Sequence, residues 1–223
     1  MGSEMCIRDS YELSDLVIKA GVDRAKALGI DDRIKFFNEN VFESEDQDKF
    51  VEKYDLVHWD NSLHHMFDVD NAIRWSVRVL KSGGVLVVDD YMGPSYMQVA
   101  QRDRQFADSV RAALPRKYLK NPVDGSVSLK SPNIPKARFL ETDPSEMADS
   151  GRIYDSLKKY CNDIEIVNGG GVLYFLGLRP LFGNFNPNNS IDIEILESLL
   201  EIDAQYTKIT SALFHGFACW KKN

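Results

Sequence analysis

Apolar positions along the first ninety residues follow two different periods in turn. Where they recur every three or four residues they predict a helix with one buried face, and where β-branched and aromatic residues run together they predict a strand. This alternation is typical of parallel βαβ units. The predicted elements are a helix from Ser14 to Gly29, a strand over 33–42, a short helix from a capping box at Ser44 and Gln47 to Lys53, a strand over 54–60, a helix from Asp68 or Asp70 to Gly83, and a strand over 85–91.

The strand over 85–91 is continuously apolar until it reaches Asp89, Asp90 and Tyr91. A parallel strand covered by helices on both faces is expected to be apolar throughout. Open α/β sheets bind ligands beyond the carboxyl ends of their strands, so the polar cluster stands where a pocket is expected. The alternative is a polar strand end that simply faces water.

The second half of the chain differs in composition. Five of the eight prolines lie in residues 115–144, which predicts a lid-like surface excursion without regular elements. Asp143, Pro144 and Glu146 then predict the start of a helix. The remaining predictions are a strand over 163–167, a glycine-rich break over 168–171, an apolar helix over 172–178, a last helix capped at Ser190 that buries Ile195, Leu199, Ile202 and Tyr206 and exposes five acids from Asp192 to Asp203, and a strand over 212–220.

Composition excludes several classes of function. A formal net charge of -7 without a dense basic stripe argues against nucleic-acid binding, because that affinity comes mainly from cationic side chains. Cys6, Cys161 and Cys219 are widely spaced, so they support neither a disulfide framework nor a zinc site, and they fit a reducing cytoplasm. The most apolar segment, 172–178, is too short to span a membrane. No residue is predicted as a metal ligand.

Several segments, taken in order, resemble the class I S-adenosyl-L-methionine-dependent methyltransferases. They are 11–42, 54–67, 80–94 and 163–171. The resemblance implies a Rossmann-like α/β fold, mostly parallel with an antiparallel last strand, as one domain over 11–223 with a helical insertion over 172–210. It is strongest for a bacterial small-molecule branch whose fifth strand ends in a Glu-Tyr-x-Gly-Pro turn, where Asp90 stands in place of the Glu.

The resemblance implies S-adenosyl-L-methionine as the cofactor. Glu12 stands where an acid accepts hydrogen bonds from both ribose hydroxyls, and Asn40 stands where a side chain meets the adenine edge. Asp60 and its neighbour stand beside the methionine moiety. The residues that the resemblance assigns to the cofactor are Glu12, Leu13, Asn40, Val41, Phe42, Asp60 and Asn61.

The resemblance also implies the transfer site, where a small-molecule acceptor would be methylated on oxygen or nitrogen. His64 and His65 face this site, and either is a candidate base for the proton of a hydroxyl acceptor. Asp90 would orient the base or the substrate, and Tyr91 would shape the pocket. Adjacent side chains do not point the same way, so one of the two histidines is expected to be structural.

Such enzymes begin with a strand and a glycine-rich loop, and no such loop precedes Glu12. Residues 1–10 match no element of the fold and resemble a translated sequencing adapter. We therefore expect a truncated reading frame that lacks the first strand, with doubtful activity in this chain. Two other functions remain open: a methyltransferase-like interaction module without catalysis, and a nucleotide-binding protein that uses the glycine run over 168–171.

Overall fold

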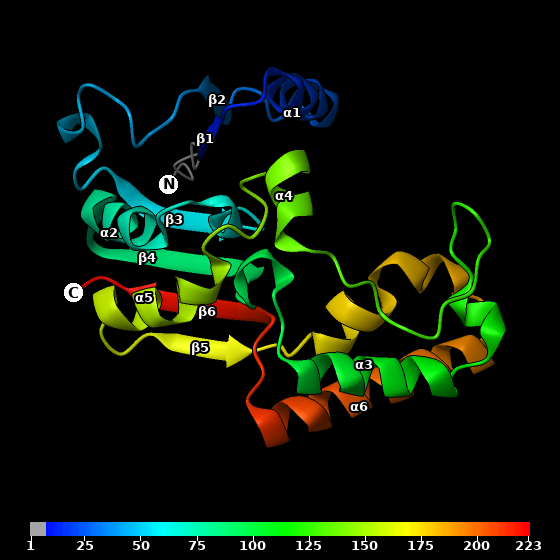
Figure 1. The fold of residues 1–223 in the computed structure, drawn as a ribbon. Helices are drawn as coiled ribbons and strands as arrows, with labels where there is room; N and C mark the ends of the chain where they lie inside the picture. The colour runs from blue at the N-terminus through cyan, green and yellow to red at the C-terminus, as the bar shows by residue number, and fades with distance from the viewer. Residues whose placement is uncertain (1–7) are drawn as a thin grey trace. The chain divides into compact units, whose positions relative to one another are not determined.

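The structure is a computed structural model that describes residues 8–223 (Figure 1). The first seven residues, which belong to the predicted leader over 1–10, lie outside the described residues. The chain divides into two compact units, one ending at Val51 and one beginning at Glu52, and each is described by itself. No helix among residues 8–223 is long and apolar enough to cross a membrane.

The first unit is a βαβ unit in which two parallel strands are joined by a helix. As predicted, the helix is capped by the Ser14 hydroxyl, which accepts from the Val17 amide, and it ends at Gly29 in the left-handed conformation. A Cβ at Gly21 would lie 2.6 Å from the ring of Phe36, so glycine lets helix and strand pack closely. The elements are β1 (Arg8–Glu12), α1 (Asp15–Leu28), β2 (Ile34–Asn38) and the 3-10 helix η1 (Asp48–Phe50).

Two predictions for the first unit are corrected. β1 begins at Arg8, which pairs with Ile34, so residues 8–10 belong to a strand although they were predicted to match no element. The short helix expected from Ser44 to Lys53 is reduced to η1. The side-chain amide of Gln47 donates to the carbonyls of Val41 and Ser44, and this arrangement replaces the predicted capping box.

The second unit is built on a sheet with strand order β3-β4-β6-β5. β3 and β4 are parallel, and β6 runs antiparallel to both of its neighbours, so the predicted mostly parallel sheet with an antiparallel last strand is confirmed. The strands are β3 (Tyr54–Asp60), β4 (Leu80–Tyr91), β5 (Glu165–Asn168) and β6 (His215–Lys221). The α-helices are α2 (Val69–Val79), α3 (Gln101–Ala113), α4 (Lys136–Thr142), α5 (Ile153–Tyr160) and α6 (Ser190–Thr210). The other helical turns are η2 (Leu63–His65), η3 (Ser95–Met97), η4 (Arg116–Leu119), η5 (Ser150–Arg152), the π-helix η6 (Leu173–Leu178) and η7 (Arg179–Asn184).

An ion cluster joins α2 to α5, which lie side by side. Asp70, in the first turn of α2, pairs with Lys159 at 2.7 Å and with Arg152 at 3.1 Å, and it accepts a hydrogen bond from Ser156. The hydrogen bond from Lys159, followed by that from Ser156, lowers the pKa of Asp70 to about 2.

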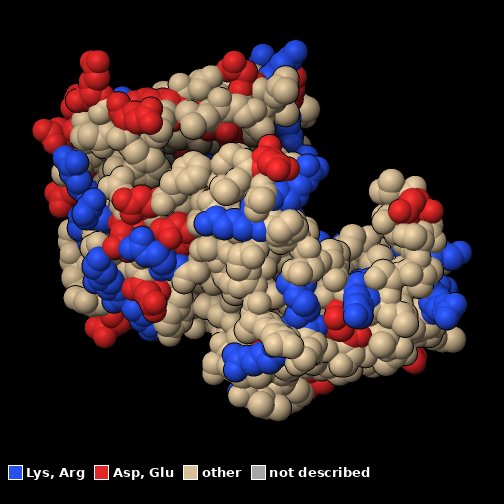
Figure 2. Space-filling view, viewed as in Figure 1, with Lys and Arg blue, Asp and Glu red and all other residues tan. Residues whose placement is uncertain are grey.

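On the face shown in Figure 2, acidic and basic residues are interspersed and form no continuous basic stripe.

The boundary between α2 and β4 differs from the prediction. α2 is capped by Asp68, which accepts from the Asn71 amide, but the helix ends at Val79 instead of continuing to Gly83. β4 begins directly at Leu80, which is fully buried and pairs with Tyr54 of β3. Because burial against a neighbouring strand satisfies this apolar stretch, strand pairing prevails over the helical period there.

The proline-rich excursion over 115–144 contains regular structure, contrary to prediction. Pro135 precedes α4, where its missing N–H costs no hydrogen bond. The helix expected to start at Asp143 is absent, because the Asp143 carboxylate accepts from the amide and the hydroxyl of Ser145 and forms a turn instead. The next α-helix, α5, begins only at Ile153, directly after the 3-10 helix η5.

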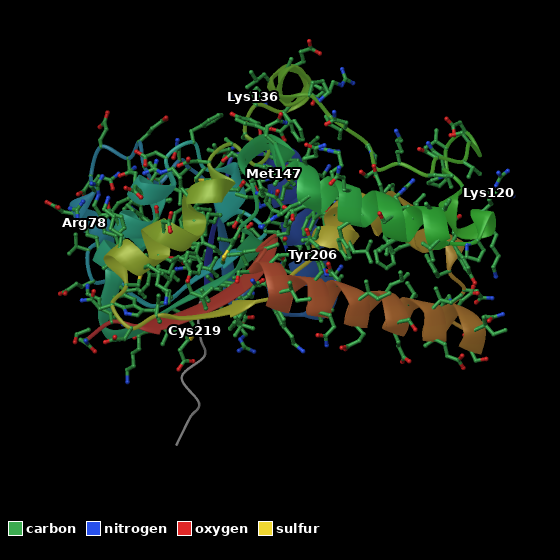
Figure 3. All side chains as sticks on the ribbon, turned by 60° about the horizontal axis from the view of Figure 1, so that its bottom comes forward. Arg78, Lys120, Lys136, Met147, Tyr206 and Cys219 are labelled. Carbon is green, nitrogen blue, oxygen red and sulfur yellow. The ribbon has the colours of Figure 1, made fainter. Side chains whose placement is uncertain are left out.

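Helices α3 and α6 lie side by side beyond the strand ends (Figures 1 and 3). The ring of Phe106 stacks on that of Tyr206, with the two ring centroids 3.8 Å apart. The Tyr206 hydroxyl donates a hydrogen bond to Asp103 at 2.7 Å. Three predictions for α6 were wrong. Its cap is Asn189 rather than Ser190, and Ile202 is 41% exposed. Two acids predicted on the solvated face are buried: Asp192 and Asp203.

The ion cluster of Asp70 gives a pH-dependent contribution to stability. The pKa of Asp70 is about 2 in the folded protein, against an ordinary value of 3.8 for a carboxyl group without these partners. The stabilisation is therefore complete above pH 3.8 and is lost as the pH falls toward 2. We expect Asp70→Asn to lower the free energy of unfolding at neutral pH, and the difference from wild type to shrink as acid is added. Urea unfolding across this range measures it. Asp155→Asn, at an exposed position of α5, is the control, and an equal loss in both variants would contradict the assignment.

Candidate functional site

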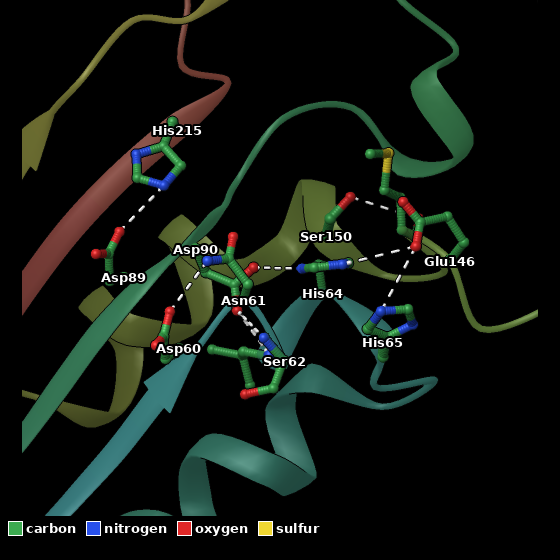
Figure 4. A network of polar contacts seen from close by, with 12 residues as sticks. Asp60, Asn61, Ser62, His64, His65, Asp89, Asp90, Glu146, Ser150 and His215 are labelled. Carbon is green, nitrogen blue, oxygen red and sulfur yellow. Dashed lines mark hydrogen bonds and ion pairs between the residues drawn. The ribbon is translucent and has the colours of Figure 1, made fainter. Parts of the chain in front are cut away.

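Polar side chains of the second unit gather where β3 and β4 end and β6 begins (Figure 4). Asp60 of β3 is paired in register with Asp89 of β4, and Tyr91 is paired with His215 of β6. Parallel β3 and β4 bring their carboxyl ends to one edge, and antiparallel β6 brings its first residue to the same edge. The predicted polar cluster at this edge is therefore present.

Asp90 is the buried centre of this cluster. Its side chain has no exposed surface, and its Oδ2 accepts hydrogen bonds from the amides of Ser62 at 2.9 Å and Leu63 at 2.6 Å. Its Oδ1 lies 2.5 Å from Nδ1 of His64. A buried carboxylate without such donors would be strongly destabilising, so Asp90 fixes both the loop after β3 and one imidazole ring.

His64 is buried between two carboxylates. Its Nε2 lies 3.8 Å from Oε2 of Glu146, on the opposite side of the ring from Asp90. Burial by itself would lower the pKa of His64, but the hydrogen bond to Asp90 and the interaction with Glu146 prevail and raise its pKa to about 9. His64 in turn lowers the pKa of the Glu146 carboxyl. In this state His64 carries a positive charge at neutral pH.

His65 also approaches this carboxylate, and its ring centroid lies 4.3 Å from that of His64. Its Nε2 lies 3.5 Å from Oε2 of Glu146, and its Nδ1 lies 3.0 Å from the hydroxyl of Ser145. That hydroxyl donates to Asp143 at 2.6 Å, so it receives the Nδ1 proton of His65. Both histidines therefore approach Glu146, and the expectation that one of them is structural stays a prediction.

Asp60 and Asn61 lie at the end of β3, as predicted. Asn61 adopts a positive φ of 45° and donates from its side chain to Asp60 at 3.0 Å. Its amide donates to the carbonyl of Asp89 at 2.9 Å, which ties the two strand ends together. Asp89 itself forms an ion pair with His215 at 3.0 Å and is 44% exposed, so it is a polar strand end beside the cluster.

Tyr91 lies next to His64, with the two ring centroids 6.4 Å apart, and its proposed role in shaping the pocket stays a prediction. It is 2% exposed, and its hydroxyl donates to the carbonyl of Pro94 at 3.1 Å. Burial raises the pKa of this phenol far above its usual range, so it does not act as a base. A Cβ at Gly93 would lie 2.5 Å from the phenol, which is why glycine is required for the ring to fold back over the turn.

A cavity of about 550 Å³ opens next to the polar edge. Asn61 and His215 reach it from the strand ends, and Tyr174, Phe175 and Phe182 line it with aromatic surface. Its volume is within the range of about 300–1,000 Å³ that is usual for small-molecule sites. The second unit thus combines an apolar chamber with a polar edge.

The remaining cofactor residues predicted from the resemblance lie in the first unit. Oε1 of Glu12, at the end of β1, accepts from the amides of Leu13 at 2.7 Å and Ser14 at 2.9 Å. The side-chain oxygen of Asn40 accepts from the amide of Phe42 at 3.1 Å, and Val41 between them is buried. The assignment of Glu12 and Asn40 to the cofactor stays a prediction.

The glycine run over 168–171 does not offer a phosphate site of the kind considered for a nucleotide-binding protein. The amides of Gly171 and Leu173 donate to the two carboxylate oxygens of Asp203 at 2.9 and 3.0 Å, and the amide of Gly170 donates to Asn168. A phosphate would need these donors. The Asp203 carboxylate of α6 already accepts the hydrogen bonds that a phosphate would need.

Sequence reasoning missed Glu146 as a functional residue. It lies 80 or more positions from the histidines, in the turn that was predicted as a helix start. The only signal in the sequence was the Asp-Pro-Ser-Glu segment itself, which is compatible with a turn as well as with a helix.

Comparison with known proteins identifies the family. A family model described as a methyltransferase domain matches residues 10–152, which is more than half of the chain. The chain belongs to this methyltransferase family. The predicted resemblance to class I S-adenosyl-L-methionine-dependent methyltransferases is thereby confirmed.

Similar proteins include other methyltransferases. The 27-O-demethylrifamycin SV methyltransferase of Amycolatopsis mediterranei (strain S699) is 31% identical over 106 residues, which cover 46% of this chain and only 38% of that protein. Phosphoethanolamine N-methyltransferase 2 of Haemonchus contortus matches 96% of this chain and 43% of its own, with 16% identity and a TM-score of 0.49. Geranyl diphosphate C-methyltransferase of Streptomyces coelicolor A3(2) matches 98% and 63%, with 12% identity and a TM-score of 0.48. Both structures contain S-adenosylhomocysteine.

The burial of Asp90 predicts a large effect of its removal. In Asp90→Asn, the amides of Ser62 and Leu63 and the ring of His64 lose a charged acceptor, so we expect the free energy of unfolding to fall by about 3 kcal/mol. Asp89→Asn, one position away but 44% exposed, is expected to cost less than about 1 kcal/mol. Urea unfolding of both variants measures the two costs. Equal costs would show that Asp90 is not the centre of the cluster.

Proposed function

We propose that the chain transfers a methyl group from S-adenosyl-L-methionine to an oxygen or nitrogen of a small molecule in the cytoplasm. The observation that carries the proposal is the histidine pair beyond the carboxyl ends of β3 and β4, with His64 held by Asp90 and His65 by Ser145, in a chain of the methyltransferase family. This edge is where ligands bind in open α/β sheets. The widely spaced cysteines support the cytoplasmic location.

The residues assigned to the cofactor fit it chemically. Asp60 is exposed at the strand end, where a carboxylate can accept from the ammonium of the methionine moiety. Glu12 has one oxygen held by two backbone amides, which orients its carboxylate toward acceptance from a ribose diol. The side chain of Asn40 is fixed by its own turn and carries an amide for the adenine edge. When bound, the cofactor supplies a methyl group on a sulfonium.

The acceptor is proposed to lie in the cavity of about 550 Å³, with its reacting atom at the polar edge. The aromatic walls would hold an apolar body, and Tyr91 would limit the chamber beside the histidines. Methyl transfer is an in-line displacement, so holding the reacting atom against the methyl carbon in a dry cleft supplies most of the rate enhancement. In the transfer, the acceptor atom would bond to the methyl carbon as the carbon–sulfur bond breaks, and the proton of the acceptor would pass to Nε2 of His65, whose Nδ1 donates to Ser145.

Calorimetric titration with S-adenosylhomocysteine tests the cofactor assignment. It is run on the 223-residue chain. We expect Asp60→Ala and Glu12→Gln to weaken binding at least tenfold, because each removes a charged acceptor, which corresponds to about 1.4 kcal/mol or more.

Each control variant removes an acid of the same type as its test variant, from the same strand or the same unit. Asp55→Ala removes an acid from the other end of β3, where it pairs with Lys81, and Glu43→Gln removes an exposed glutamate of the first unit. Neither is expected to change the affinity. Absence of binding by the wild-type chain would favour a non-catalytic interaction module, and equal binding by Asp55→Ala and Asp60→Ala would contradict the site.

A further inference from the structure

Three electron-pair donors of the polar cluster face one another. Nε2 of His65 lies 3.5 Å and Nε2 of His64 lies 3.8 Å from the same oxygen, Oε2 of Glu146. One ligand atom from each of these residues lies within 4.8 Å of the others, a grouping capable of holding a metal ion among residues 8–223.

Hydrogen bonds on the far side of each ring determine which nitrogen is available. Nδ1 of His65 must donate to the hydroxyl of Ser145, because that hydroxyl gives its own proton to Asp143. Nδ1 of His64 faces Oδ1 of Asp90, which is an acceptor. A metal ion binds only the neutral form of a ring, and in that form these bonds leave the lone pair of each Nε2 directed at Glu146.

This pattern is the one that metal-binding histidines show in proteins. A ligating histidine almost always donates its other ring N–H to a carboxylate, a carbonyl or a similar acceptor, and this outer bond fixes the ring. Asp90 has this position for His64, and Ser145, backed by Asp143, has it for His65. Asp90 is itself fixed by two backbone amides, so the outer bonds are rigid.

We propose that His64, His65 and Glu146 form a binding site for a divalent transition metal ion, with Zn²⁺ as its simplest occupant. Two imidazoles and one carboxylate are a donor set that suits Zn²⁺ and other first-row divalent ions. Bond lengths of about 2.0–2.2 Å require the three donors to close together by side-chain rotation. The side chain of Glu146, which is 27% exposed, can supply this rotation while the outer bonds keep the two rings in place. At least one coordination position remains for water or a small-molecule oxygen.

This inference goes beyond the proposed methyl transfer and does not depend on it, because metal binding is measured without cofactor or acceptor. Co²⁺ is the probe, since its visible absorption reports tetrahedral nitrogen and oxygen ligands. A thiolate band in the near ultraviolet would instead report the cysteines. We expect one equivalent of Co²⁺ per chain, without the thiolate band, and displacement by Zn²⁺.

Variants assign the ligands. His65→Ala and Glu146→Gln are expected to weaken Co²⁺ binding by more than tenfold, and Ser145→Ala by about tenfold through loss of the outer bond. His58→Ala, which removes an exposed histidine of β3, is the control and is expected to bind as wild type does. Circular dichroism establishes that each variant is folded. Absence of stoichiometric binding, a thiolate band, or unchanged affinity in both His65→Ala and Glu146→Gln would overturn the proposal.

Discussion

Asp90 is a carboxylate without exposed surface, and the polar edge of the second unit is arranged around the need to satisfy it. Three donors meet its two oxygens: the amides of Ser62 and Leu63 and the ring of His64. A charge in this position is tolerated only when it is paired and fully hydrogen-bonded. The loop after β3 therefore turns toward β4, and the orientation of His64 follows from that turn.

The topology of the sheet supplies the setting for this interaction. Because β3 and β4 run in parallel, Asp60, Asp89 and Asp90 end at one edge, and antiparallel β6 adds His215 there. The apolar cavity opens beside the same edge. Glu146 arrives from a turn far along the chain and contacts both histidines. A cluster of opposite charges beside an apolar chamber is an arrangement in which electrostatic interactions are strong, since little water competes.

Much of this architecture could be predicted from the sequence because the relevant signals are local. The Ser14 cap and the Gly29 stop of α1 lie within the helix they delimit, and the apolar run before Asp89 marks a buried strand in any context. The joint position of His64 and Asp90 followed from strand direction together with the family resemblance. These inferences needed no knowledge of distant residues.

Other features depend on tertiary partners that no local pattern reveals. Leu80 begins β4 because Tyr54 pairs with it, although the helical period includes it. In the sequence, Asp203 resembles the other acids on the solvated face of the helix. In the structure it is buried, and it accepts hydrogen bonds from the amides of Gly171 and Leu173. Glu146 joins the histidines only because Asp143 folds the preceding turn. In each case an interaction across many residues decides the outcome.

Amide hydrogen exchange, followed by nuclear magnetic resonance in wild type and in Asp90→Asn, tests the organising role of Asp90 most directly. The account predicts that the amides of Ser62 and Leu63 are protected in wild type and lose protection in the variant. The amide of Asn61, which donates to the backbone of Asp89, is predicted to keep its protection. Unchanged exchange at Ser62 and Leu63 in the variant would contradict the account.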